Sequence, residues 1–267
     1  MRIIAAALGL WATLNIGLTD VAQGTLDAAA PATAAAKPLV LLAGATGNNG
    51  SPILRQLQEL PGAPYRVRAM TRDVSKAKAK FGATAAWVEW IEADVTKPET
   101  LNAALDGVDY IIDAKAAPMS PFGDSPEAIN FQGTLNMIAA AKAVGRVKKY
   151  VAITSSSAGI KNHFLNTIGR DVLIYMGLAE DALIASGIPY VIIGPARLND
   201  DPSGRSIVLM PRADYVTGMA VTRADVARVC IAALANPAAD NRAFTVANGE
   251  GVYDDPWQQA FARMPVK

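Results

Sequence analysis

From Lys37 onward, the chain alternates short apolar segments with longer segments in which apolar residues recur at helical spacing. Short runs rich in Val, Ile and Leu predict strands buried on both faces, and the longer segments predict helices. The first strand is predicted over 38–43 and the first helix over 51–60, where Pro61 ends it. Later strands are predicted over 65–70, 87–93, 108–113, 148–154 and 190–193, with a short basic helix after residue 70 and helices over 97–105, 127–144 and 179–186.

This alternation predicts parallel strands joined by right-handed helical crossovers, hence a Rossmann-type, doubly wound α/β sheet. The pattern changes after Pro195, where loops precede a helix and one more strand over 242–247. Thr222 stands three residues before Asp225, which approximates a helix capping box. We therefore expect a single domain over 38–267, with a small C-terminal lobe at about 196–267 over the site where substrate would sit.

The first 37 residues have a different character. A basic start and an apolar run over 3–18 predict a signal peptide or membrane-targeting segment over 1–24, followed by a flexible linker over 25–37. The run is shorter than the roughly 20 residues of a spanning helix, so a permanent anchor is the less favoured alternative. The leader predicts an exported or membrane-associated protein, in a periplasm or an organelle. A misassigned start would make the protein cytoplasmic.

Composition excludes several function classes. The net charge is +1, from 25 basic and 24 acidic side chains, which predicts no nucleic-acid partner. Membrane contact is expected only through the leader. The single cysteine, Cys230, lies in an apolar helical pattern and predicts a core residue, and no Cys or His pair has metal-ligand spacing. The basic run at Lys76, Lys78 and Lys80 predicts a solvated helix surface.

A glycine-rich segment follows the first predicted strand and opens the first helix. Its residues are Gly44, Ala45, Thr46, Gly47, Asn48, Asn49 and Gly50. Glycines in this context permit a tight turn, close approach of the backbone to a pyrophosphate, and close packing of helix on strand. The helix N-terminus then presents free amides to the phosphates. The segment predicts a dinucleotide site; a tight turn without a ligand is the alternative.

The end of the second strand bears on which dinucleotide binds. Arg72 can meet the 2′-phosphate of NADP with a charged, bidentate fork. Asp73 follows it, and a carboxylate here would hold the ribose hydroxyls of NAD. We predict NADP as cofactor, with NAD as the alternative.

Ligands of doubly wound sheets lie at the carboxyl ends of the strands. Asp94 and Val95 end the third strand, where the adenine would lie, and Ala114 and Lys115 follow the fourth. We predict that all four residues belong to the cofactor site. For Lys115, contact with the ribose or the substrate competes with a role as an exposed loop lysine.

Several motifs recur in the order of a known family. They are the segment 44–50, residues 130–136, the strand entry 147–151, the run from Glu180 to Tyr190, and 225–227. Over about residues 38–247, the chain resembles the atypical short-chain dehydrogenases/reductases, specifically their NmrA-like and related NAD(P)H-binding branch. The resemblance implies a Rossmann fold, a preference for NADP(H), and a cofactor contact from Pro195 after the sixth strand.

The chain departs from the pattern of that superfamily at the catalytic residues. The usual Tyr-x-x-x-Lys pair is absent, because Ala179 stands four residues after Tyr175. The lysine that often precedes the helix glutamate is Met176, and the usual Arg-Pro is Gly194-Pro195.

Three side chains remain as candidate catalytic groups. Ser156, at the serine-rich end of the fifth strand, could polarise a carbonyl, and a polar strand cap is the alternative. His163 has an intrinsic pKa suited to proton transfer near neutrality, and Tyr175 could act as a general acid without a lysine partner.

Two functions follow from these features. The first is an NADP-dependent oxidoreductase, or a related isomerase, acting on a small carbonyl or similar molecule. The second is a non-catalytic NADP(H)-binding redox sensor or assembly factor. Export is in tension with both, because free NADP(H) is scarce outside the cytoplasm.

Overall fold

The computed structural model describes residues 36–252 and 256–267, and Lys37–Lys267 form one compact unit. The predicted leader over 1–24 and nearly all of the linker lie outside the described residues. Within the described part of the chain, no helix combines the length and apolar character needed to cross a membrane.

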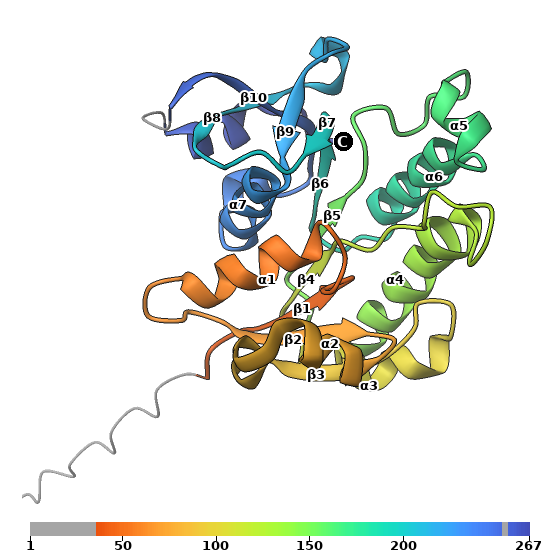
Figure 1. Cartoon of the computed structure of the whole chain (residues 1–267), viewed down its shortest axis with the longest axis vertical. Helices are drawn as coiled ribbons and strands as arrows, with labels where there is room; N and C mark the ends of the chain where they lie inside the picture. Colours follow the sequence, from red (N-terminus) through yellow and green to blue (C-terminus); the bar gives the residue numbers. More distant parts are fainter. Residues whose placement is uncertain (1–35, 253–255) are drawn as a thin grey trace, which may run out of the picture. The chain divides into compact units, whose positions relative to one another are not determined.

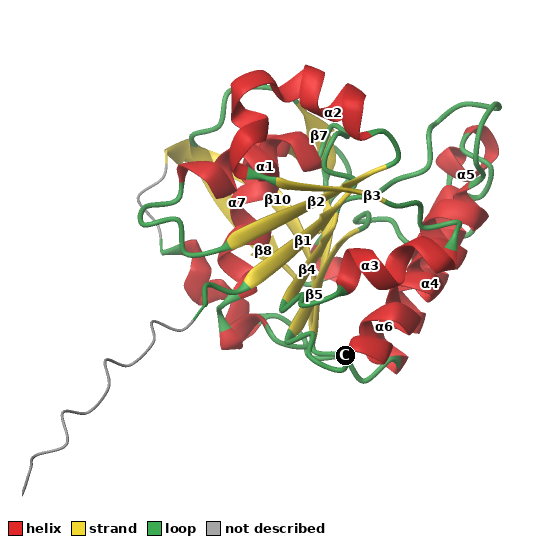
Figure 2. Cartoon of the chain, turned by 90° about the horizontal axis from the view of Figure 1, so that it is seen from below, coloured by secondary structure: helices red, strands yellow, loops and turns green. Residues whose placement is uncertain are grey.

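The centre of the unit is an eight-stranded, mostly parallel sheet (Figures 1 and 2). In spatial order its strands are β3 (Glu89–Glu92), β2 (Arg66–Thr71), β1 (Leu39–Ala43), β4 (Tyr110–Asp113), β5 (Lys149–Ile153), β6 (Tyr190–Pro195), β10 (Arg242–Val252) and β8 (Arg205–Met210). Only β8 runs antiparallel to its neighbour, β10. The order 3-2-1-4-5-6 within this sheet confirms the predicted doubly wound Rossmann fold.

Helices cover both faces of the sheet. They are α1 (Gly50–Glu59), α2 (Val74–Phe81), α3 (Leu101–Leu105), α4 (Gly133–Val144), α5 (Phe164–Ile168), α6 (Val172–Ala185) and α7 (Arg223–Leu234). Successive side chains of a strand point to opposite faces, so β1 contributes Val40 to one core and Leu41 to the other. The first core includes apolar residues of α1, α2 and α7, and the second those of α3, α4 and α6.

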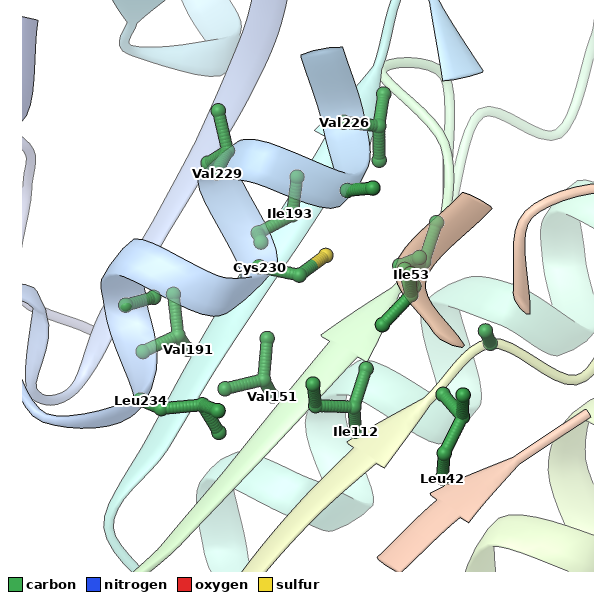
Figure 3. Close-up of a cluster of buried hydrophobic side chains, with 14 of the residues drawn as sticks. Leu42, Ile53, Ile112, Val151, Val191, Ile193, Val226, Val229, Cys230 and Leu234 are labelled. Atoms are coloured by element: carbon green, nitrogen blue, oxygen red, sulfur yellow. The ribbon is translucent and has the colours of Figure 1, made fainter. Parts of the chain in front are cut away.

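Figure 3 shows the first core where α7 packs on the sheet. Cys230 of α7 lies among Val151, Ile193 and Ile53, and all four side chains are inaccessible or nearly so. Burial raises the pKa of the Cys230 thiol far above its ordinary value. Cys230 is therefore a small core residue, as the sequence predicted.

The C-terminal segment adds two strands to the main sheet, so it is joined to the sheet more closely than the sequence predicted for a small lobe. β10 pairs with β6 in parallel, and β8 then extends the sheet by one edge strand. Only β7 (Arg197–Asn199) and β9 (Ala220–Thr222) form a separate, two-stranded sheet. The N-cap half of the predicted capping box is confirmed, because the amide of Asp225 donates to Thr222 Oγ1 at 3.0 Å at the start of α7. The amide of Thr222 donates to Asn248 Oδ1 at 2.9 Å.

Among the differences from the predicted element boundaries, three concern helices near the candidate site. The helix predicted over 127–144 begins with a π-helical segment, Glu127–Gln132, before α4. The helix predicted over 179–186 begins already at Val172 and ends at Ala185. α5 was not predicted, because it has only five residues and its apolar Phe164 and Ile168 are exposed.

Candidate functional site

The predicted phosphate loop joins β1 to α1 over residues 44–50. It is a tight turn in which Gly47 N donates to Gly44 O at 2.9 Å, and Ser51 N donates to Gly47 O at 3.0 Å. A Cβ added at Gly50 would lie 2.1 Å from Gly44 O, so any side chain there requires the backbone to move. The loop therefore holds α1 closer to β1 than a residue other than glycine would allow.

This loop lies where the order of the sheet reverses. β1 pairs with β2 on one side and with β4 on the other, so the loops after β1 and β4 begin side by side. Ala114 N donates to Ala43 O at 3.0 Å. Gly44 has φ +74°, and a Cβ on it would lie 2.7 Å from Lys115 N. Ala114 and Lys115 therefore form one wall of the phosphate loop, at the position where such sheets bind ligands.

The loop has the features that a pyrophosphate requires. Asn48 and Asn49 precede the first intrahelical bond of α1, so their amides stand at the positive end of the helix. Asn49 Oδ1 is buried and has no hydrogen-bond partner within the described residues. The amides of Asn48 and Asn49 fit the phosphate oxygens of a dinucleotide, and the close packing at Gly50 holds the loop that presents them. Thr46, Asn48 and Asn49 would border its phosphates.

Arg72 and Asp73 follow β2 as predicted, and both carry local contacts. Arg72 Nη1 lies 2.9 Å from Asp124 Oδ2, with the Arg72 side chain 66% exposed. Asp73 caps α2 by accepting a hydrogen bond from Lys76 N at 2.9 Å. That hydrogen bond, together with the Lys76 ammonium, lowers the pKa of Asp73. The Asp73 carboxylate is thus used as the N-cap of α2, whereas the Arg72 side chain is exposed.

Asp94 and Val95 lie after β3. Asp94 Oδ1 accepts from the amide of Thr96 at 2.9 Å and from its hydroxyl at 2.8 Å. Val95 is buried, and its side chain fills the space where a Cβ on Gly133 would lie, 2.7 Å from Val95 Cγ2. Asn136 Nδ2 also donates to Val95 O at 2.8 Å, so α4 fixes this turn at the end of the sheet.

The Lys115 side chain is largely buried, so Lys115 is not an exposed loop lysine. Its ammonium lies 2.5 Å from Asp113 Oδ2 and donates to Thr134 Oγ1 at 2.8 Å. The side chains of Lys115 and Asp113 are 9% and 5% exposed. Tyr150 also donates to Asp113 Oδ2, at 2.6 Å. Complete burial, and then the neighbouring Asp113 carboxylate, raise the pKa of Tyr150 well above its ordinary value.

A narrow cavity opens beside this network, between the ends of β4 and β5 and helices α4 and α6. Its polar lining includes Asp113, Lys115, Asn130, Thr134, Thr154 and Glu180, and Met176 contributes an apolar side. Asn130 Oδ1 accepts from Ala117 N at 3.0 Å, but the buried Nδ2 of Asn130 has no partner among the described residues. The cavity therefore holds a lysine ammonium and an unsatisfied amide close to the phosphate loop.

Ser156 and Pro195 come together at the ends of β5 and β6. Ser156 N donates to Pro195 O at 3.0 Å, and Ser156 is buried. A Cβ on Gly194 would lie 2.8 Å from Ser155 O, so these two strand ends are in close contact. The side chain of Ser156 thus sits at the same end of the sheet as the phosphate loop.

His163 and Tyr175 are held outside the cavity. His163 caps α5, because its Nδ1 accepts from Leu165 N at 3.2 Å, and its ring stacks on Phe164 at 5.0 Å. The Tyr175 hydroxyl donates to Glu127 Oε2 at 3.3 Å. Partial desolvation and then the Glu127 carboxylate raise the pKa of Tyr175, which keeps the phenol protonated.

Two polar contacts of the site were not predicted. Lys80, assigned from sequence to a solvated helix surface, donates from Nζ to Thr46 O at 2.6 Å and to Ser51 Oγ at 3.2 Å. Lys80 is exposed, as that assignment predicted, but α2 ends beside the phosphate loop, so the Lys80 ammonium also reaches the loop. Arg212 forms two hydrogen bonds with Glu180 of α6. In each case the partners are more than 25 residues apart in sequence, so no local pattern could reveal the contact.

Comparison with known proteins indicates a family that binds the same class of ligand. Residues 44–237 match the model of a family described as NAD(P)H-binding. Sanguinarine reductase of Eschscholzia californica is 31% identical over 256 residues, which cover 81% of this chain and 91% of the relative. The NAD(P)H azoreductase of Xenophilus azovorans is 27% identical over 214 residues, covering 78% and 67% of the two chains.

Among solved structures, the oxidoreductase ylbE from Lactococcus lactis superposes with a TM-score of 0.69 over 84% of this chain and 95% of that one. Its sequence identity is 21%, so this likeness concerns the fold. The narrower assignment to the NmrA-like branch stays a prediction. With a family model that spans most of the described residues and a Rossmann sheet around a phosphate loop, the chain belongs to the NAD(P)H-binding family, within the atypical short-chain dehydrogenases/reductases.

Proposed function

We propose that this protein is an NADP(H)-dependent oxidoreductase acting on a small carbonyl or related electrophile. The observation that carries the proposal is the Lys115 ammonium, which lines a cavity next to the phosphate loop and is held by the buried Asp113 carboxylate. A fixed positive charge in a site shielded from water stabilises negative charge that develops during reaction. Asp113 and Thr134 would keep that charge in place.

A bound NADPH would supply the hydride, and the protein would supply position and a proton. Thr46, Asn48 and Asn49 would hold the phosphates, and Pro195 and Lys115 would border the nicotinamide end. Ser156 would donate a hydrogen bond to the substrate oxygen from the end of β5. His163 lies outside this cavity, so we assign it no contact with the substrate.

Two of the relatives bear reductase names, which guides the choice of substrates to test. The screen would include aldehydes, quinones, sanguinarine and azo compounds. The absorbance of NADPH would be used to monitor its oxidation by the full chain and by each variant below.

The variant Lys115→Met tests whether the Lys115 ammonium stabilises charge during the reaction. We expect turnover to fall about 100-fold or more, the scale reached when one preorganised charge-stabilising group is removed. Lys142→Met, on the exposed face of α4, is the matched control and should leave turnover unchanged. Because Lys115→Met leaves a buried carboxylate without its cation, the double variant Asp113→Asn/Lys115→Met keeps the test valid if the single variant fails to fold. Unchanged turnover in the folded double variant would remove Lys115 from the mechanism.

A second function is favoured by a different observation. Met176 lines the cavity in the place of a possible acid–base residue, and Glu180 is bound on both oxygens by Arg212. These contacts fit a non-catalytic protein that senses the NADPH/NADP⁺ ratio. In that case calorimetry would detect tight binding of NADP(H) but the screen would show no turnover. If calorimetry detected no dinucleotide binding at all, both functions would fail.

We also propose that the leader over 1–24 delivers the chain to a compartment that holds NADP(H). Expression of the full chain, cell fractionation and N-terminal sequencing of the mature protein would test this. Recovery of unprocessed protein in the cytosol would contradict it.

A further inference from the structure

The Lys80 ammonium of α2 reaches the phosphate loop. It lies 2.6 Å from the carbonyl oxygen of Thr46 and 3.2 Å from the hydroxyl of Ser51. Both acceptors are neutral, and the described residues give the Lys80 ammonium no carboxylate partner. A positive charge without a counter-charge thus stands at the edge of the loop that would hold the phosphates.

Arg72 provides a second cation at the adjoining strand end. It follows β2, the strand paired with β1, so it lies at the same edge of the sheet as the phosphate loop. Its contact with Asp124 joins two side chains that are 66% and 44% exposed. Exposed ion pairs contribute little free energy, typically below about 1 kcal/mol, so this contact can be exchanged for a stronger acceptor.

The acidic residue between these cations is already used. Asp73 accepts a hydrogen bond from Lys76 N at 2.9 Å, and the Lys76 ammonium lies 3.4 Å from its Oδ2. The Asp73 carboxylate is therefore directed to the first turn of α2, whose positive end it stabilises. It would not serve as the acceptor for ribose hydroxyls that NAD binding sites use at this place.

Taken with the proposed function, on which this step rests, we propose that Lys80 and Arg72 together form the site for the 2′-phosphate of NADP(H). Lys80 would contribute a point charge from the phosphate-loop side, and Arg72 a planar fork from the end of β2. Lys80 would then be a residue that determines the choice between the two dinucleotides. When the Lys80 ammonium leaves its two neutral acceptors for a phosphate dianion, it replaces weaker hydrogen bonds with a charge-assisted one.

The test is calorimetric titration of the full-length protein with NADPH and NADH, for wild type and for Lys80→Ala, Arg72→Ala and the double variant. Lys78→Ala is the matched control, because Lys78 is an exposed lysine on the same helix. Adenosine 2′,5′-bisphosphate and AMP serve as additional probes, because they report on the adenosine end alone.

We expect Lys80→Ala to weaken NADPH and the bisphosphate about tenfold or more, with NADH and AMP changed less than twofold. Lys80→Arg should restore most of the loss, and Lys78→Ala should match wild type. The wild-type preference for NADPH should fall as salt rises, because the contact is electrostatic.

Equal weakening of NADPH and NADH would overturn the inference, since Lys80 would then only support the loop or contact the pyrophosphate. An unchanged affinity for NADPH would overturn it as well. If wild type binds NADPH and NADH equally, the chain still binds dinucleotides, and only the 2′-phosphate site is refuted. Failure of wild type to bind either one would refute the proposed function itself. Thermal melts of each variant establish that it is folded.

Discussion

Arg212 donates two hydrogen bonds to the carboxylate of Glu180, with Nη1–Oε2 at 2.7 Å and Nη2–Oε1 at 2.8 Å. The Glu180 side chain is 4% exposed, and that of Arg212 is 19% exposed. Gly194 makes the approach possible, because a Cβ there would lie 3.1 Å from Arg212 Nη2. The contact joins α6 to the segment between β8 and β9. It therefore connects the two sides of the candidate substrate region.

Removal of Arg212 should therefore destabilise the fold strongly. Arg212→Met leaves a buried carboxylate without its cation, which typically costs about 3–5 kcal/mol. Urea denaturation of the wild type and the variant measures this free energy of unfolding. The double variant Glu180→Gln/Arg212→Met removes both charges and should recover part of the loss. A double variant no more stable than Arg212→Met alone would mean that the ion pair is not the source of the effect.

Gly50→Ala should damage the phosphate loop. The added Cβ would lie 2.1 Å from Gly44 O, so the turn must open. Strain of this kind costs about 1–3 kcal/mol, and affinity for NADPH should fall about tenfold or more. Calorimetry measures the affinity and urea denaturation the stability. Gly62→Asn is the control, because Gly62 has φ +72° and no atom within 4 Å of an added Cβ. Wild-type affinity in Gly50→Ala would show that the loop does not contact the cofactor.

The central sheet was predictable because its strands are short apolar runs with sharp ends. The strands of the C-terminal segment were less so. β8 alternates partly and fully buried positions as an edge strand, and β7 and β9 have three residues each. Such short strands depend on the neighbours that the fold supplies, and not on a pattern within the strand.

The same distinction applies to the site. The glycines of the phosphate loop carry their geometry in the local sequence, so the loop was found from the sequence alone. Lys115 was placed at the right strand end, but its burial depends on Asp113, Thr134 and Tyr150, which meet only in the folded chain. The contact of Lys80 with Thr46 spans 34 residues and arises because the end of α2 reaches the phosphate loop.

Asp109 should make stability depend on pH. Burial would raise the pKa of Asp109, but hydrogen bonds from Leu39 N, Arg146 and Lys148 outweigh it and lower the pKa. A lowered folded-state pKa adds stability above the unfolded-state pKa, about 4, and this stability is lost as pH falls through the folded-state value. Asp109→Asn should cost about 1–3 kcal/mol at pH 7. The difference from wild type should shrink below about pH 4.

Urea denaturation at several pH values between neutrality and strong acid measures the free energy of unfolding and so tests this prediction. Asp106→Asn is the control, because Asp106 is exposed and lies three residues away. Curves for wild type and Asp109→Asn that stay parallel down to the lowest pH would contradict the assignment. The loss of stability in Asp109→Asn should begin in the sheet, because Asp109 joins the start of β4 to β1. Leu39 N donates to Asp109 Oδ2 at 3.0 Å.

Gly177→Ala should displace the loop that carries two of the candidate catalytic groups. An added Cβ on Gly177 would lie 2.6 Å from Gly159 Cα, where the loop after β5 rests on α6. Gly159 N donates to Leu173 O at 2.7 Å, and this bond fixes the loop between Ser156 and His163. The variant should lose about 1–3 kcal/mol of stability.

The decisive measurement is hydrogen exchange at the Gly159 amide, which should lose protection in Gly177→Ala but keep it in Leu178→Ala, an exposed position on the same helix. NADPH affinity should change little, because the phosphate loop lies on a different segment. Any turnover found in the substrate screen should fall, because Ser156 would no longer be held at the ends of β5 and β6. Retained protection at Gly159, together with wild-type turnover, would show that the loop tolerates the added methyl group and that its close contact with α6 does not position the candidate groups.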